Sequence, residues 1–320
     1  MIEIDGLTKR FGPITAVAGI DLRVGKGEVL GFLGPNGAGK STTMKMVAGY
    51  LAADDGRVRI CGHDIETETL AAQREIGYLP EGAPAYPDMT PRTFLAFIAR
   101  ARGFAGEAAS KAIATAVAKT ELDAVLDQPI ETLSKGFKRR VGVAQAILHD
   151  PPVLIMDEPT DGLDPNQKHS VRTLIRAMAP TKAIIISTHL LEEVEAICTR
   201  AVIIDRGRVV ADGTPAQLLA RSRHHNAVTV ILPPEKAAAA SAKLKAMADV
   251  ASIEQGKPED GAVSITAFPK GGALLIEQIS ATAVAEHWDV KELYAEAGRL
   301  DDVFRAITTP DAARARESRA

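Results

Sequence analysis

The feature that most constrains this chain is a glycine-rich segment, residues 34–41, with the sequence G-P-N-G-A-G-K-S. It follows an apolar run at 29–33 that is typical of a buried parallel strand, and it precedes a helical pattern. Glycines let backbone N–H groups turn inward around an anion, and the N-terminus of a helix favours negative charge. Spacing and context together predict a phosphate-binding loop.

This loop indicates which side chains meet a nucleotide. Lys40 is expected to reach the outer phosphates of ATP, and Ser41 is expected to give its hydroxyl to Mg²⁺, which bridges phosphate oxygens. A glycine-rich turn without a ligand is the alternative, and the strand–loop–helix context argues against it. The loop residues expected to bind the nucleotide are Gly34, Pro35, Asn36, Gly37, Ala38, Gly39, Lys40, Ser41 and Thr42.

A pair of carboxylates after the apolar run 153–156 is the second candidate. Asp157, at the predicted strand end, is suited to hold Mg²⁺ directly or through water. Glu158 can accept the proton of an attacking water if it lies within hydrogen-bond reach. An Asp-Glu pair after a strand is by itself more often a solvated turn, but the phosphate loop upstream favours a catalytic role.

Composition limits the cellular compartment and the classes of partner that we expect for the chain. It has 46% hydrophobic and 25% charged residues, and no apolar stretch reaches the ~18 residues that a membrane-spanning helix needs. The first residues lack the features of a secretion signal and only two cysteines occur, so we expect a cytoplasmic, reduced protein. The formal charge of −3 argues against a broad nucleic-acid surface, and the basic run 138–140 is expected to be an exposed helix start.

The chain has two regions of different texture. In residues 1–220, short apolar runs alternate with helical patterns, as in an α/β domain with buried parallel strands. Within it, residues 88–150 predict a helical insert without a strong strand. The polar stretch 221–226 marks the boundary to a second domain.

Residues 221–308 predict a smaller α+β domain with a ferredoxin-like order of elements, strand–helix–strand–strand–helix–strand, and a final helix. Residues 309–320 are predicted to be a disordered tail. The expected strands are 227–232, 251–254, 262–267 and 289–294, and the expected helices are 235–247, 274–285 and 300–307.

With these motifs in hand, the first 220 residues resemble the ATP-binding subunits of ABC transporters. The segment 133–137, L-S-K-G-F, stands just before a helical pattern and ahead of Asp157, where that family carries its signature. In the family, the signature of one subunit closes over the ATP of the other. The resemblance therefore implies that Ser134 and Gly136 contact the γ-phosphate held by a partner, in a homodimer with two shared sites.

Three further positions take their roles from the same resemblance. Asp164 lies in D-G-L-D at 161–164, which resembles the loop that crosses the dimer interface. His189 resembles the histidine that contacts the γ-phosphate. Phe11 matches the family aromatic that stacks on adenine, and a flat ring suits a purine face.

Two departures from the family pattern occur. Glu81 stands where the family usually has Gln; its carboxylate can still coordinate Mg²⁺, but it adds negative charge beside the γ-phosphate. The signature carries Lys135 and Phe137 where the commonest form has Gly and Gln. Neither change removes Ser134 or Gly136, so activity is expected to survive.

The C-terminal region ends with the segment R-L-D-D-V-F-R-A-I at 299–307. With this segment it resembles the accessory domain of ABC-2 type export ATPases, including those linked to gliding motility, multidrug and daunorubicin export. The resemblance implies a P-loop ABC ATPase core with a helical subdomain and a small accessory domain. It also implies a homodimer that hydrolyses ATP to power a separate transmembrane permease, on the inner face of the cell membrane and without nucleic acid.

Two alternatives belong to other functional classes. A soluble ABC-type ATPase acting on ribosomes or DNA typically carries two cores or long coiled coils, whereas this chain has one core and no sustained heptads. A subunit that binds ATP without hydrolysing it is disfavoured by the intact Asp157-Glu158 pair and by His189.

Overall fold

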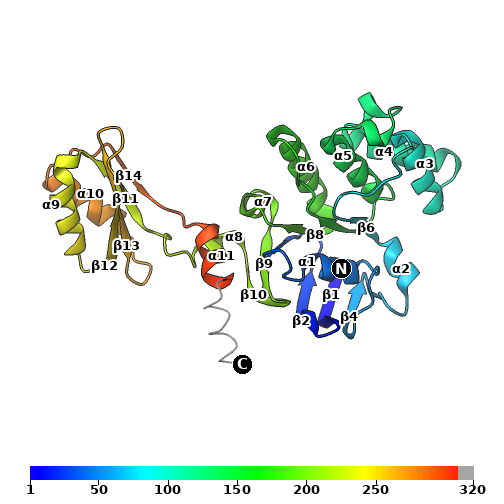
Figure 1. Ribbon diagram of the computed structural model, residues 1–320, viewed down its shortest axis with the longest axis horizontal. Coiled ribbons are helices and arrows are strands. Elements are labelled where there is room, and N and C mark those ends of the chain that lie inside the picture. The colour runs from blue at the N-terminus through cyan, green and yellow to red at the C-terminus, as the bar shows by residue number, and fades with distance from the viewer. Residues whose placement is uncertain (309–320) are drawn as a thin grey trace. The chain divides into compact units, whose positions relative to one another are not determined.

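The computed structural model describes residues 1–308, which fall into two compact units (Figure 1). The first unit is Met1–Pro215, and the second begins at Ala216. Each unit has a hydrophobic core of its own. The tail predicted to be disordered, 309–320, lies outside the described residues.

A six-stranded sheet organises the first unit, and its strand order is β10-β9-β3-β8-β7-β6. The apolar runs at 29–33, 153–156 and 183–186, all predicted as buried strands, form its centre and are buried throughout, which confirms the prediction. All neighbours are parallel except β10 and β9. The bounds are β3 Val29–Leu33, β6 Ile76–Leu79, β7 Val153–Asp157, β8 Ala183–Thr188, β9 Arg200–Asp205 and β10 Arg208–Gly213.

The parallel register brings the candidate motifs to one edge of this sheet. Leu33 is paired with Thr188, and Asp157 is paired with Ser187. The glycine-rich loop, the carboxylate pair and His189 therefore all follow the carboxyl ends of adjacent strands. In open parallel sheets this edge is where ligands bind.

A second, antiparallel sheet of the first unit has the order β2-β1-β4-β5 and was not indicated by the sequence patterns. Its buried residues, such as Ile4 and Ile20, share one hydrophobic core with Phe32 of the central sheet and Met44 of helix α1. Phe11 stands at the end of β1. The bounds are β1 Ile2–Phe11, β2 Ile14–Val24, β4 Asp55–Ile60, β5 His63–Asp64, α1 Lys40–Val47 and α2 Thr69–Arg74.

Residues 88–150, all of which are described, contain helices and no strand. Helix α3 begins with a capping box in which Thr90 accepts from the backbone of Thr93, and Pro91 occupies the first turn. This insert comprises α3 Pro91–Ala101, α4 Gly106–Thr120, the 3-10 turns Asp123–Val125 and Ile130–Thr132, and α5 Lys135–Ile147. The remaining helices of the core are α6 Pro165–Met178, a 3-10 turn Ala179–Thr181 and α7 Leu191–Ile197. Helix α8, Pro215–Leu219, starts at the last residue of the first unit.

The second unit has the predicted order of strands and helices, with ends shifted by a few residues. Its sheet is antiparallel, with the order β12-β13-β11-β14. Side chains of α9 and α10 share a core with this sheet, closed by Trp288, so both helices pack on one face (Figure 1). The bounds are β11 Val228–Leu232, α9 Pro234–Lys245, β12 Val250–Gln255, β13 Val263–Pro269, α10 Ile276–Ala285, β14 Glu292–Ala295 and α11 Leu300–Thr308.

Among the helices of residues 1–308, none combines the length and apolar character required to span a membrane.

Candidate functional site

A cavity of about 450 Å³ opens beside the glycine-rich loop, at the edge where the parallel strands end. Its lining comes from separate segments of the chain: the end of β1, the start of β2, the loop with α1, and the loops after β6 and β7. The structure thus gathers most of the predicted nucleotide residues around one space. The lining residues are Phe11, Ala16, Asn36, Gly37, Gly39, Lys40, Ser41, Thr42, Glu81 and Glu158.

Close packing explains the glycines of the loop. Gly39 has a φ of 106°, and a Cβ there would stand 2.4 Å from the Ala16 carbonyl oxygen. A Cβ on Gly34 would meet the carbonyl oxygen of Ile204 at the same distance. The loop is therefore pressed against β2 and β9, and any side chain at these two positions would displace it.

Lys40 is the charged group of the loop. Its side chain is buried, and its Nζ donates to the carbonyls of Gly34 at 2.8 Å and Pro35 at 3.2 Å. Burial lowers the pKa of Lys40, while the carboxylates of Glu158 and Asp157 oppose that shift. These contacts hold the ammonium against the inner side of the loop, where an anion bound by the loop would lie.

Asp157 ends β7 and is only 1% exposed. One carboxylate oxygen accepts a hydrogen bond from the Ser187 hydroxyl, whereas Oδ2 is buried and has no hydrogen-bond partner among the described residues. A buried carboxylate oxygen left free in this way is suited to face a cation or the water bound to it.

Glu158 is held from three sides. Its backbone has a φ of 50°, which is uncommon for a residue with a side chain. Its N–H donates to the Ser187 hydroxyl at 2.9 Å, and its carbonyl accepts from Arg139. Its carboxylate lies 2.9 Å from Nδ1 of His189. The structure therefore brings Glu158 and His189 into direct contact, as a base and its orienting partner require.

The other predicted residues lie outside this cavity. Ser134 is the N-cap of α5 and accepts from the N–H of Phe137 at 3.3 Å. Asp164 is the N-cap of α6 and accepts from the N–H of Gln167 at 2.9 Å. A Cβ on Gly136 would stand 2.4 Å from the Gln167 side chain, so the starts of α5 and α6 are in close contact. Within one chain, these residues do not join the phosphate loop.

One expectation was wrong. The basic run 138–140 was predicted to be exposed, but Arg139 is 5% exposed and bonds to Glu158. Its neighbours Lys138 and Arg140 are half-buried, and Arg140 pairs with Glu121 at 2.6 Å. The signal was present in the helical spacing, because Arg139 stands four residues before Val143 on the buried face of α5.

The fold and the site define a P-loop ATPase: a parallel sheet carries the phosphate loop after a central strand and a carboxylate pair after a nearby one. The family model described as ABC transporter matches residues 17–161.

Three similar proteins agree with this class. A Nod factor export ATP-binding protein from Paraburkholderia xenovorans is 39% identical over 220 residues, 68% of this chain and 72% of that protein. The linearmycin resistance ATP-binding protein of Bacillus subtilis is 31% identical over 309 residues, 96% of this chain and 98% of that protein. A solved ATP-binding subunit of an ABC transporter superposes with a TM-score of 0.63 at 30% identity, over 68% of this chain and 91% of its own.

The chain therefore belongs to the ATP-binding proteins of ABC transporters. It is an ATP-binding ATPase of that family.

Proposed function

We propose that two copies of this chain close on two ATP molecules, and that closing and reopening drive a separate membrane permease. The observation that carries the proposal is the division of the site. The cavity contains the phosphate loop and Glu158, whereas Ser134 and Gly136 lie outside it at the start of α5. A second copy could therefore bring its α5 to the γ-phosphate, a contact that ADP cannot offer.

For hydrolysis, we assign the general base to Glu158. Its carboxylate accepts the proton of the water that attacks the γ-phosphate, and His189, 2.9 Å away, orients it. Lys40 neutralises the outer phosphates, with the backbone N–H groups of the loop around them. Phe11, which is 49% exposed at the rim of the cavity, offers a ring face for adenine.

The residues at this site fit Mg²⁺. The free Oδ2 of Asp157 is the observation in favour, and Ser41 and Glu81 line the adjoining cavity. We propose that these three residues hold the ion, which when bound offsets the negative charge of the phosphates. Glu81 brings a full negative charge where an amide is usual in the family, so the Glu81→Gln variant should bind the cation less tightly.

We propose that the second unit is a ferredoxin-like accessory domain. Its antiparallel strand order and its two helices on one face support this assignment. The linearmycin resistance relative aligns over nearly the whole chain, so the accessory unit is shared with a resistance-type subunit. Resistance and export in the names of the relatives make outward transport the proposed direction.

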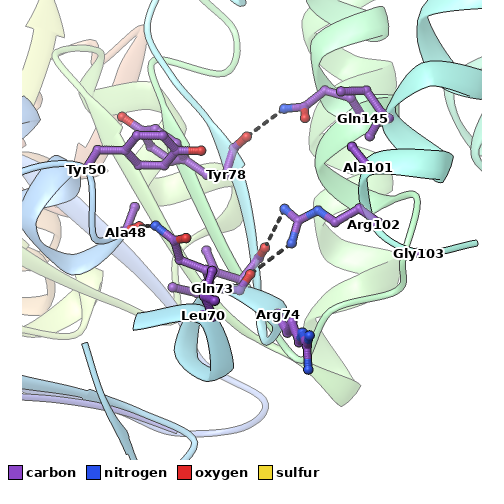
Figure 2. A pocket seen from close by; sticks show the side chains of 12 residues that line it. Ala48, Tyr50, Leu70, Gln73, Arg74, Tyr78, Ala101, Arg102, Gly103 and Gln145 are labelled. Atoms are coloured by element: carbon purple, nitrogen blue, oxygen red, sulfur yellow. Dashed lines mark hydrogen bonds between the residues drawn. The ribbon is translucent and has the colours of Figure 1, made fainter. Parts of the chain in front are cut away.

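A groove between the core and the helical insert is the proposed docking site of the permease (Figure 2). It has a volume of about 470 Å³. Tyr50 and Leu70 line its core side and are 68% and 75% exposed, which is unusual for large apolar side chains. Arg102 and Gln145 line its other side. An apolar patch rimmed by polar groups in this way is typical of protein docking sites.

The two sides of this groove are joined by hydrogen bonds to backbone carbonyls (Figure 2). Arg102 donates to Gln73 at 2.9 Å and to Ile76 at 3.2 Å, and Gln145 donates to the carbonyl of Tyr78 at 2.7 Å. A permease segment seated in the groove would touch both the core and the insert. It would also hold the ATPase at the inner face of the cell membrane.

The test is affinity capture of a tagged Glu158→Gln chain from detergent-solubilised membranes with ATP and Mg²⁺ present. We expect one multi-spanning protein to be recovered, because the closed dimer persists when hydrolysis is blocked. A Lys40→Ala chain is the nucleotide-free control, and Leu70→Asp should lower recovery while leaving ATP affinity unchanged. Recovery of ribosomal or DNA-repair proteins without a membrane protein would instead favour the soluble alternative.

A further inference from the structure

A buried arginine links the helix that starts at Ser134 to the proposed catalytic base. Arg139 lies on α5, is 5% exposed, and donates from Nη2 to the main-chain carbonyl of Glu158. Its Nη1 is also buried and has no hydrogen-bond partner among residues 1–308. A guanidinium loses favourable hydration when it is buried, so a purely packing role would be served better by an apolar side chain.

The bond falls on a residue whose backbone needs support. Glu158 has a φ of 50°, a conformation that residues with a side chain seldom adopt. Ser187 holds the N–H of Glu158 from β8, and Arg139 holds its carbonyl from α5. Both peptide groups that flank the Cα are thus fixed. This leaves the Glu158 carboxylate aimed at His189, from which it is separated by 2.9 Å.

The surrounding charges are consistent with a charged guanidinium at this point. Burial lowers the pKa of Arg139, and the carboxylates of Asp161 and Glu158 act in the opposite direction. Arginine keeps its proton under such conditions, so the cation persists beside the acidic loop that follows β7. The carbonyl bond is therefore a charge-assisted one, which is stronger than a neutral bond.

We propose that Arg139 is a positioning residue that holds Glu158 in its left-handed conformation and so aims the carboxylate at the attacking water. The inference rests on the role of Glu158 given above. Ser134 caps the same helix only a little more than one turn before Arg139. The base of one nucleotide site is thereby tied to the helix that meets the nucleotide of the other copy.

The first test compares Arg139→Gln with Arg140→Gln, since Arg140 is the next residue of the same helix and pairs with the exposed Glu121. For Arg139→Gln we expect kcat for ATP hydrolysis to fall at least about tenfold, while KM stays within about twofold, because only the chemical step loses its base geometry. Arg140→Gln should keep both values. Arg139→Lys, which retains one charged donor, should recover part of the lost kcat.

Mixed dimers make the test independent of folding defects. In a dimer of one Arg139→Gln copy and one Glu158→Gln copy, the remaining base belongs to the copy without its arginine, and we expect kcat to fall at least about tenfold below that of a dimer of wild type and Glu158→Gln. In a dimer of one wild-type copy and one copy with both changes, the remaining base still has its arginine. This dimer should match a dimer of wild type and Glu158→Gln.

The outcomes separate this inference from the function it rests on. Loss of hydrolysis in Glu158→Gln with full activity in Arg139→Gln would overturn the positioning role alone. Equal loss of hydrolysis in both mixed dimers would assign Arg139 to general packing of α5. The same conclusion would follow if Arg139→Gln clearly lowered ATP affinity and the melting temperature along with kcat. Retained hydrolysis in Glu158→Gln would remove the proposed base itself.

Discussion

The two units of this protein differ in how they treat buried polar groups. In the first unit, several buried side chains contain an atom without a hydrogen-bond partner, and these atoms belong to Tyr78, Arg139, His149, Asp157 and Glu193. In the described part of the second unit, no such atom occurs. There, Thr229 bonds to Thr266 at 2.8 Å, and Ser222 and His224 both bond to Asp302.

The difference indicates in which unit buried polar atoms remain available to a ligand. An unpartnered buried group is costly, and it persists where a ligand or a movement supplies the missing partner. Asp157 precedes Glu158 and Arg139 bonds to it, and Glu158 lines the cavity, so both fit this description. The second unit instead closes an apolar core that includes Trp288 and Ile279.

Glu158→Gln should give the largest effect and tests whether chemistry is confined to the first unit. Because the amide cannot accept the proton of water, kcat should fall by about 10²–10⁴-fold while ATP still binds. The matched control is Glu254→Gln, which removes an exposed carboxylate of the second unit that pairs with Arg223. Steady-state ATPase assays measure both variants. A comparable loss of kcat in the control would contradict the claim that hydrolysis depends on the first unit alone.

Ile279→Ala tests whether the second unit contributes to stability and not to ATP hydrolysis. Ile279 is fully buried in the core of the second unit, and its truncation should lower the free energy of unfolding by about 2–5 kcal/mol. Urea unfolding would measure the loss, with Val284→Ala on the exposed face of α10 as a near-neutral control. The KM for ATP should not change, and a parallel rise in KM would show that the units are not separable.

Phe11→Ala compares two exposed aromatic rings, one in each unit. Loss of a stacking platform costs about 1–3 kcal/mol, so ATP affinity should weaken by roughly tenfold or more. Tyr294 of the second unit is exposed to a similar extent, and Tyr294→Ala should leave affinity unchanged. Calorimetric titration with ATP measures both. Unchanged binding by Phe11→Ala would remove the adenine assignment.

The smallest effect concerns His149, a half-buried histidine of the first unit. Burial lowers the pKa of His149 to about 4, so the unfolded chain binds this proton more tightly than the folded one. Stability from this group is therefore present above about pH 6.5 and is lost as pH falls toward 4. We expect His149→Gln to reduce the drop in melting temperature between about pH 7 and pH 5 by a few degrees.

The control for His149→Gln is a variant of His169, an exposed histidine of α6. His169→Gln should keep the pH dependence of the wild type. His224 of the second unit has its Nδ1 bonded to Asp302, so it lacks the unpartnered nitrogen of His149. An identical pH profile for wild type and His149→Gln would contradict this account.

Sequence patterns predicted the parts of the fold that one continuous segment specifies. The strand before the phosphate loop, the apolar strand before Asp157 and the alternating elements of the second unit are of this kind. The helical spacing indicated that Arg139 is buried, but its partner Glu158 lies on another segment, so the contact between them could not be predicted. The pairing of β4 with β1 was missed for the same reason, since α1 lies between them in the chain. The hairpin of β1 and β2 is local, and its pattern was overlooked.

The position of β3 has a consequence for how the protein is made. Leu30 is paired with both Ile185 of β8 and Arg200 of β9, and the N–H of Val29 bonds to Thr199, 170 residues later in the chain. A ribosome therefore releases the strand that bears the phosphate loop long before either neighbour exists. Until β9 emerges, this apolar strand is unpaired and needs protection from aggregation. Chains that end before β8 and β9 should consequently be unable to capture ATP.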